Sequence, residues 1–200
     1  SGPSHAEEVA QEKLTYLTVG TKNSKLGKYI SELLKTKYII STVSNDMIGI
    51  EYSSSLKNIY SIMVGIAHGL GYGDNFLSVL ISHCSKEMSD FIKDVHKTNR
   101  KINQSAYLGD LLVTTYSSFS RNRTFGNMIG KGYSIKSAKA EMNMIVEGYY
   151  ATKNAFMLSK KLSTKFLIID FCYKILFENK SAKRQMKELS KYLDWGFKLL

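Results

Sequence analysis

The stretch Tyr52–Gly73 reads YSSSLKNIYSIMVGIAHGLGYG, and it decides the fold of the chain around it. Apolar side chains recur at every third or fourth position from just before this stretch to its end: Ile48, Tyr52, Leu56, Ile59, Met63, Ile66 and Leu70. This spacing predicts a long helix that starts at Asp46. A neighbouring strip of the same helix carries small or polar side chains: Ser54, Lys57, Asn58, Ser61 and Gly65. A helix of this kind is expected to be buried on both sides.

Lys57 is the only formally charged residue between Tyr52 and Gly73. One interpretation is that its aliphatic stem lies along the helix edge while the ammonium group reaches the surface. The other is that the ammonium group lies in a sheltered polar pocket. The serines before Lys57 and the amide of Asn58 favour the polar pocket.

A second stretch, Tyr107–Gly126, reads YLGDLLVTTYSSFSRNRTFG. Hydroxyl side chains lead into Arg121-Asn122-Arg123 where a helix is expected to begin, and this combination is typical of an anion site. The plainer alternative is a solvated basic turn with Asp110 as a helix cap. Asp110 has the wrong charge for an anion, and we expect it to orient a cation, for which Lys57 is the best candidate.

Composition narrows the class of protein. The chain has 200 residues with a net charge of +11, which favours an acidic partner such as nucleic acid, an anionic membrane or a phosphorylated small molecule. The lysines form no run, so a nucleic-acid stripe is not predicted. Cys84 and Cys172 are far apart, which predicts free thiols and a cytoplasmic location. We predict no membrane span and, from the spacing of the histidines, no metal site.

We predict a mainly α fold in two parts. Residues 1–44 are expected to be α/β, and residues 45–200 to be an all-helical substrate-binding and catalytic domain. In the first part, strands are expected at 15–21 and 38–43, with a helix capped by Asn23 between them. Two strands do not make a stable sheet by themselves, so we interpret this part as the tail of a larger α/β domain. Further helices are expected at 74–97 (capped by Asp74), 127–131, 134–142, 149–162, 166–177 and 181–195, with a loop at 96–101.

Taken together, the motifs resemble the NAD(P)-dependent glycerol-3-phosphate dehydrogenases. The similarity covers nearly the whole chain and is carried by blocks that occur in the family's order: Ser1–Ser4 with Ala6 and Glu8-Val9, Leu56–Asn58, Gly69–Asn75, Gly109–Leu111 with Thr114, Ser120–Arg123 with Phe125-Gly126, Val146–Gly148, and Leu176–Lys180. Family members begin with a Rossmann domain, and its G-x-G-x-x-G/A turn does not occur in this sequence. The resemblance therefore implies a remnant of that domain followed by the helical domain.

The resemblance also implies an activity and a set of site residues. The reaction would be the reduction of dihydroxyacetone phosphate to sn-glycerol 3-phosphate, for glycerophospholipid synthesis, with NAD or NADP as cofactor and a possible homodimer. Lys57 would exchange the proton with the substrate oxygen and Asp110 would orient Lys57. The other positions implied to bind substrate are Gly2, Ser4, Asn58, Thr114, Ser120, Arg121 and Asn122. The positions implied to contact the cofactor are Ala6, Arg121, Ile145 and Glu147.

The sequence departs from the family pattern at several places. Ser54-Ser55 and Gln104–Leu108 stand where the family has glycines, His5 replaces a bulky apolar residue, and Asn179 replaces a glycine. Two alternatives to the dehydrogenase stay open at this point. One is a basic helical binding module on the same fold, and the other is a related hydroxy-acid dehydrogenase, against which the Arg-Asn-Arg segment argues.

Overall fold

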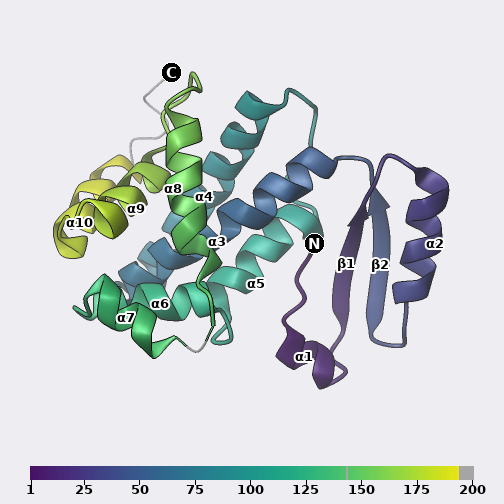
Figure 1. The fold of residues 1–200 in the computed structure, drawn as a ribbon, viewed down its shortest axis with the longest axis horizontal. Coiled ribbons are helices and arrows are strands. Elements are labelled where there is room, and N and C mark those ends of the chain that lie inside the picture. Colours follow the sequence, from purple (N-terminus) through teal and green to yellow (C-terminus); the bar gives the residue numbers. More distant parts are fainter. Residues whose placement is uncertain (143, 194–200) are drawn as a thin grey trace.

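The structure is a computed structural model, and it describes residues 1–142 and 144–193. Two parts lie side by side, with the N-terminus between them (Figure 1). The first is a small α/β part: α1 (Ala6–Ala10), β1 (Thr15–Gly20), α2 (Ser24–Leu34) and β2 (Ile39–Ser44). The strands are parallel, with Thr15 opposite Ile39 and Gly20 opposite Ser44. Asn23 caps α2 as predicted, since its side chain accepts a hydrogen bond from Leu26 N.

The second part is helical, and α3 (Met47–Gly69) runs through its centre (Figure 1). The elements around it are α4 (Asp74–Val95), the π-helix η1 (Ser105–Gly109), α5 (Asp110–Tyr116), α6 (Arg121–Gly130), α7 (Ile135–Glu141), α8 (Glu147–Ser159), α9 (Leu167–Phe177) and α10 (Ala182–Leu193). The mainly α fold class is confirmed. The proposed division into domains at residue 44 stays a prediction.

The core forms where the apolar faces of α3 and α4 meet the later helices. Ile59, Met63 and Ile66 of α3 are fully buried, as the helical spacing predicts, together with Leu80 and Phe91 of α4. Ile48 is an exception: it lies in the first turn of α3 and is exposed. No helix in the described part of the chain is long and apolar enough to cross a membrane.

One predicted helix and one predicted cap were wrong. A separate helix at 127–131 was expected, but these residues belong to α6, which begins at Arg121, where the anion-site pattern predicted a helix start; the Ser120 hydroxyl caps it by accepting a hydrogen bond from Arg123 N. Asp74 was expected to cap α4. Instead Gly73 is the N-cap and Asp74 is the first helical residue, where its charge complements the helix dipole. The predicted end of the last helix, Trp195, lies outside the described residues.

The α3–α6 contact is unusually close because glycines line it. A side-chain carbon added to Gly65 would overlap the carbonyl oxygen of Arg123, and one added to Gly126 would overlap that of Ile62. Gly69 and Gly130, one turn further along each helix, meet the opposite backbone in the same way. The glycines therefore let the backbones of α3 and α6 touch, which brings the start of α6 against the middle of α3.

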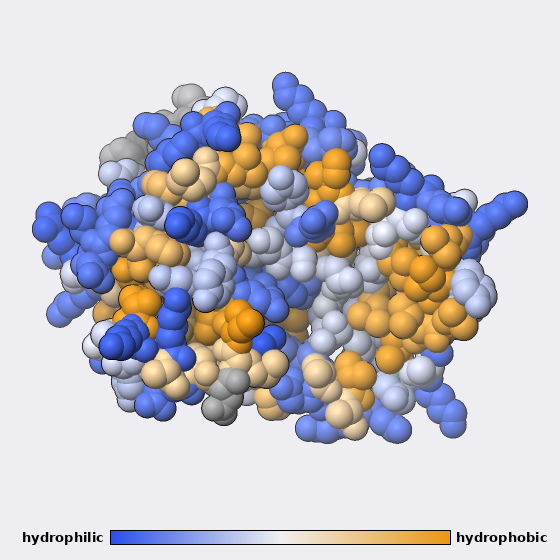
Figure 2. Space-filling view, viewed as in Figure 1, coloured by the Kyte–Doolittle hydropathy of each residue, from blue (hydrophilic) through white to orange (hydrophobic). Residues whose placement is uncertain are grey.

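The α/β part leaves much apolar surface uncovered. Leu26, Leu33 and Leu34 of α2 are exposed, and so is Ile40 of β2. Figure 2 shows apolar side chains gathered on the surface over this part of the molecule.

Candidate active site

The candidate site forms around an ion pair between Lys57 of α3 and Asp110, the first residue of α5. Lys57 Nζ lies 2.6 Å from Asp110 Oδ1. The side chains are 19% and 3% exposed, so the ammonium group is in a polar pocket and does not extend to the surface. A buried carboxylate without a cationic partner would be costly, and the pair avoids that cost.

The second oxygen of Asp110 contacts the N-terminal segment. Asp110 Oδ2 accepts hydrogen bonds from Ser1 Oγ (3.1 Å) and from Gly2 N (3.3 Å). Gly2 has φ +134°, and a side chain there would overlap the carbonyl oxygen of Tyr16 in β1. Only glycine fits this backbone position without strain. Asp110 thus ties the α/β part to the helical part.

A ladder of polar contacts aligns α3 with η1 and α5. Ser53 Oγ donates to Ala106 O (3.3 Å), Lys57 donates to Asp110, and Ser61 Oγ donates to Thr114 O (2.8 Å). The partners in each pair are 53 residues apart in sequence, so the two segments run in the same direction, in step, for two turns. Ser53 makes the first of these contacts, whereas the sequence pattern had placed Ser54 on the polar strip of the helix.

The start of α6 carries the predicted anion-binding residues. The buried Ser120 hydroxyl is used internally, as the α6 cap and as the partner of Ser61 Oγ at 2.9 Å. Arg121 Nη1 donates to Ile145 O (3.4 Å), and the Arg121 side chain thereby crosses toward the segment before α8. Within the described residues, the buried Nε of Arg123 has no hydrogen-bond partner. The free N–H groups of the first turn and two guanidinium groups make this helix end suited to a phosphate.

Two asparagines join this helix end to α8. Asn122 Oδ1 accepts a hydrogen bond from Gly148 N (2.9 Å), and Asn58 Nδ2 donates to Glu147 Oε2 (3.2 Å). A side chain at Gly148 would overlap the Asn58 carbonyl oxygen, so α3, α6 and α8 meet closely here. Glu147, implied by the resemblance to contact a cofactor, also holds the amide of Asn58.

The predicted site residues therefore form two groups. Asp110, Lys57, Thr114, Gly2 and Ser4 make the first, with Ser4 Oγ donating to Gly2 O (3.0 Å). The residues at the α6 and α8 starts make the second: Asn58, Ser120, Arg121, Asn122, Ile145 and Glu147. The buried Ser61 hydroxyl joins them, through Thr114 O on one side and Ser120 on the other. Ala6, exposed in the first turn of α1, is the predicted residue that the structure does not bring into either group.

Sequence reasoning missed several contributors. Ser1 was noticed only as part of a motif, and nothing indicated that it would reach Asp110. Ser61 was placed on the polar strip but without a partner. Arg100 was assigned to a loop, and nothing in the neighbouring sequence indicated the ion pair that it makes with Asp46. No cluster of three potential metal ligands occurs in the described ranges.

Several solved structures with a similar fold are glycerol-3-phosphate dehydrogenases. The chain matches the crystal structure of the Coxiella burnetii enzyme with a TM-score of 0.90 and 32% sequence identity, over 94% of this chain and 58% of that one. The structure from Dunaliella salina matches with a TM-score of 0.84 at 20% identity, over 93% of this chain and 34% of that one, which supports the fold alone. The fold thus places the chain in the class of helical dehydrogenase domains.

The family follows from the sequence comparisons. Residues 46–187 match the family model described as the NAD-dependent glycerol-3-phosphate dehydrogenase C-terminus. A curated relative from Staphylococcus aureus (strain JH9), named glycerol-3-phosphate dehydrogenase (NAD(P)+), is 37% identical over 189 residues, which are 94% of this chain and 57% of the relative. The chain belongs to the NAD-dependent glycerol-3-phosphate dehydrogenase family. It spans somewhat more than half the length of the curated relatives it matches.

Proposed function

We propose that this chain provides the substrate-binding and proton-transfer part of an enzyme that reduces dihydroxyacetone phosphate to sn-glycerol 3-phosphate. The observation that carries the proposal is the sheltered Lys57–Asp110 pair, 2.6 Å between Nζ and Oδ1, in a family of dehydrogenases. It lies one α3 turn from Ser61, which contacts the Arg121-bearing end of α6. The proposed proton donor and the proposed phosphate site thus lie next to each other along α3.

Lys57 is the proton donor in this proposal. A reduced nicotinamide supplies a hydride to the C2 carbonyl carbon when it is bound, and the electron pair of the carbonyl bond moves to oxygen. The developing negative charge is stabilised by the Lys57 ammonium group, which passes one proton to that oxygen. The product alcohol then carries the hydride on carbon and the proton on oxygen. Asp110 keeps the ammonium group in place and does not itself transfer the proton.

The phosphate end of the substrate is assigned to the start of α6. Arg121, the free N–H groups of the first turn and the Asn122 and Asn58 amides would hold it, and this fixes the distance from phosphate to C2. Ser120 acts indirectly, because its hydroxyl already caps the helix and bonds Ser61. Gly2, Ser4 and Thr114 surround Asp110 on the opposite side.

The cofactor in this proposal is NAD or NADP. Arg121, Ile145 and Glu147 fit its nicotinamide end, because the guanidinium group already reaches Ile145 O and Glu147 is exposed beside it. Ala6 is the contact proposed from the α/β part. A role in glycerophospholipid synthesis and association into a homodimer stay predictions from the family resemblance, and a cytoplasmic location stays a prediction from the two separate cysteines.

The test is steady-state kinetics on a fusion of this chain to the nucleotide-binding part of the S. aureus relative. Lys57→Met keeps the stem and removes the charge, so kcat should fall by about 10²–10⁴, the range that general acid–base catalysis contributes. Asp110→Asn should lose less, because it only orients the lysine.

Circular dichroism of both variants checks that they are folded. A folded Lys57→Met fusion with near-normal kcat would remove Lys57 from the mechanism.

A further inference from the structure

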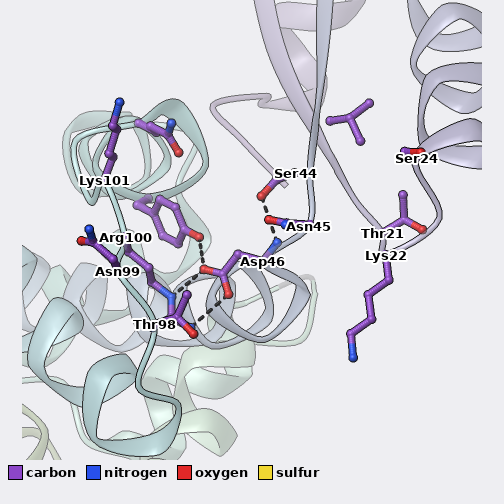
Figure 3. A pocket seen from close by; sticks show the side chains of 13 residues that line it. Thr21, Lys22, Ser24, Ser44, Asn45, Asp46, Thr98, Asn99, Arg100 and Lys101 are labelled. Atoms are coloured by element: carbon purple, nitrogen blue, oxygen red, sulfur yellow. Dashed lines mark hydrogen bonds and ion pairs between the residues drawn. The ribbon is translucent and has the colours of Figure 1, made fainter.

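A second polar cluster lies at the N-terminal end of α3, about three turns before Lys57. It consists of Asp46, Arg100 and Tyr107, and we call it the Asp46 cluster. Asp46 caps α3, with Oδ1 accepting a hydrogen bond from Gly49 N (3.1 Å). Arg100 binds the same carboxylate through two nitrogens, Nε to Oδ2 (2.5 Å) and Nη2 to Oδ1 (3.0 Å). The Tyr107 hydroxyl donates to Oδ2 at 2.5 Å. Figure 3 shows Asp46 and Arg100 facing each other.

The cluster is sheltered although it borders an open cavity. The Arg100 and Asp46 side chains are 7% and 13% exposed. The cavity beside them has a volume of about 570 Å³, between the carboxyl ends of β1 and β2 and the loop before η1. Ion pairs on the exposed surface contribute little to stability. A sheltered pair in which arginine binds the carboxylate through two nitrogens also fixes the geometry of both side chains.

The charges in the cluster are fixed over the physiological range. Burial acts to raise the pKa of Asp46, but the hydrogen bonds from Arg100, Tyr107 and Gly49 outweigh it, so the pKa lies below its ordinary value. Burial, together with the hydrogen bond to Asp46, raises the pKa of Tyr107 well above the usual range. The cluster is therefore a permanent contact and does not act as a pH switch.

The cluster matters for the candidate site because Tyr107 belongs to the π-helix that leads into Asp110. Gly109 N donates to Gln104 O (3.3 Å), the five-residue spacing of a π-turn. Such turns are rare and are found mostly at functional sites, since surrounding contacts must hold them. Here the contacts come from α3: Asp46 holds the Tyr107 side chain and Ser53 holds the Ala106 carbonyl.

The same helix, α3, carries Asp46 as its cap and also Ser53 and Lys57. The position of the Asp46 cluster relative to the Lys57–Asp110 pair is therefore set by this helix. The distance along α3 from Asp46 to Lys57 is fixed by the helix. The distance from Tyr107 to Asp110 is fixed only if η1 keeps its π-turn. Arg100 secures that turn from outside by holding Asp46 against Tyr107, and it also donates to His96 O (2.7 Å).

We propose that Arg100 and Tyr107 are positioning residues for the Lys57–Asp110 pair. They act through Asp46 and η1 and touch neither substrate nor cofactor. The expected effect on kcat rests on the proposed function, whereas the expected effect on the placement of the Lys57–Asp110 pair does not.

The first experiment therefore needs no enzymatic activity. The 200-residue chain is pulsed with acetic anhydride, and acetylation of Lys57 is followed by mass spectrometry. An ammonium group held by a carboxylate in a sheltered pocket is screened from the reagent and reacts slowly. Tyr107→Phe removes one hydroxyl and should speed acetylation of Lys57, while Tyr133→Phe, which alters an exposed tyrosine, should not. Unchanged Lys57 reactivity in Tyr107→Phe would overturn the proposal.

The second experiment separates positioning from general stability. In the fusion, a misplaced catalytic group can cost about 10²-fold for a shift of about 1 Å, so a partial loss in Tyr107→Phe should lower kcat about tenfold. KM for dihydroxyacetone phosphate should stay within about twofold, because the phosphate residues are on α6. The kcat of Arg100→Met should be close to that of Tyr107→Phe. Arg100→Lys keeps the charge but not the two-nitrogen contact, so its kcat should lie between those of Arg100→Met and the parent fusion.

The outcomes of the two experiments are distinguishable. Equal losses of kcat in Arg100→Lys and Arg100→Met, or a loss expressed only in KM, would contradict a positioning role. An inactive parent fusion would defeat the proposed function, and the acetylation experiment would then decide the positioning proposal by itself.

Discussion

At the scale of single residues, Glu87 of α4 combines burial with two strong hydrogen bonds. Its carboxylate accepts from Ile168 N (2.8 Å) and Ile169 N (3.0 Å), at the start of α9. Burial, with smaller contributions from nearby Asp90 and Asp170, nevertheless raises the pKa of Glu87 to about 8, against the effect of the two N–H groups. In the unfolded chain a glutamate ionises near its ordinary value of about 4.3.

This shift makes stability depend on pH. The folded state binds more protons than the unfolded state between pH 5 and 8, so the free energy of unfolding should fall as pH rises through that window. We expect a loss of about 2–4 kcal/mol over this window. Glu87→Gln removes the titrating group, and its stability should vary less with pH. Urea unfolding of both chains at pH 5, 6.5 and 8 measures the difference, and parallel curves would contradict the prediction.

At the scale of elements, the α3–α6 contact determines where the start of α6 lies. In an ordinary helix, Gly→Ala favours folding by up to about 1 kcal/mol. At Gly65 the added carbon would overlap the Arg123 carbonyl oxygen, so the helices must separate. We expect Gly65→Ala to lower the free energy of unfolding by about 1–3 kcal/mol, the range for overpacked interiors.

Gly109→Ala is the matched control, because Gly109 has helical φ and ψ angles (−60° and −45°) and a side-chain carbon there would meet Ser105 and Pro3 at ordinary distances. It should be neutral or stabilise by about 0.4–1 kcal/mol. Urea midpoints of the two variants compare them directly. If Gly65→Ala proved as stable as Gly109→Ala, close glycine packing would not be what sets the α3–α6 distance.

At the scale of the whole molecule, we expect that the α/β part of this chain does not bind a nucleotide by itself. Its two-stranded sheet is marginal by itself, and apolar residues such as Tyr29 and Leu33 are exposed on it. The sequence also contains no G-x-G-x-x-G/A turn to hold a pyrophosphate. We therefore expect isothermal titration calorimetry of the 200-residue chain with NADH to show no specific binding at sub-millimolar concentrations. The fusion serves as the positive control, and tight stoichiometric binding by the chain itself would refute this interpretation.

Local pattern determined much of this protein. The three-to-four spacing of apolar residues was enough to predict α3, and the helix starts predicted at Asn23, Ser134 and Ser181 are where the structure has them. Asn179 was noticed where relatives have glycine, and it adopts φ +53°, a left-handed angle that asparagine tolerates better than most residues. These features depend on neighbours within one or two turns, which is the range that a sequence pattern reports.

Only the tertiary structure decided how these elements meet. The constant register of Ser53, Lys57 and Ser61 against η1 and α5 depends on how closely the helices approach, and so does the meeting of Asn58 with Glu147. Arg100 had no sequence signal, because its partner Asp46 is 54 residues away and no periodicity links the two. Residue types and spacing determined which groups were present. Packing between elements far apart in sequence determined which of them touch, because those contacts depend on helix geometry that local patterns do not encode.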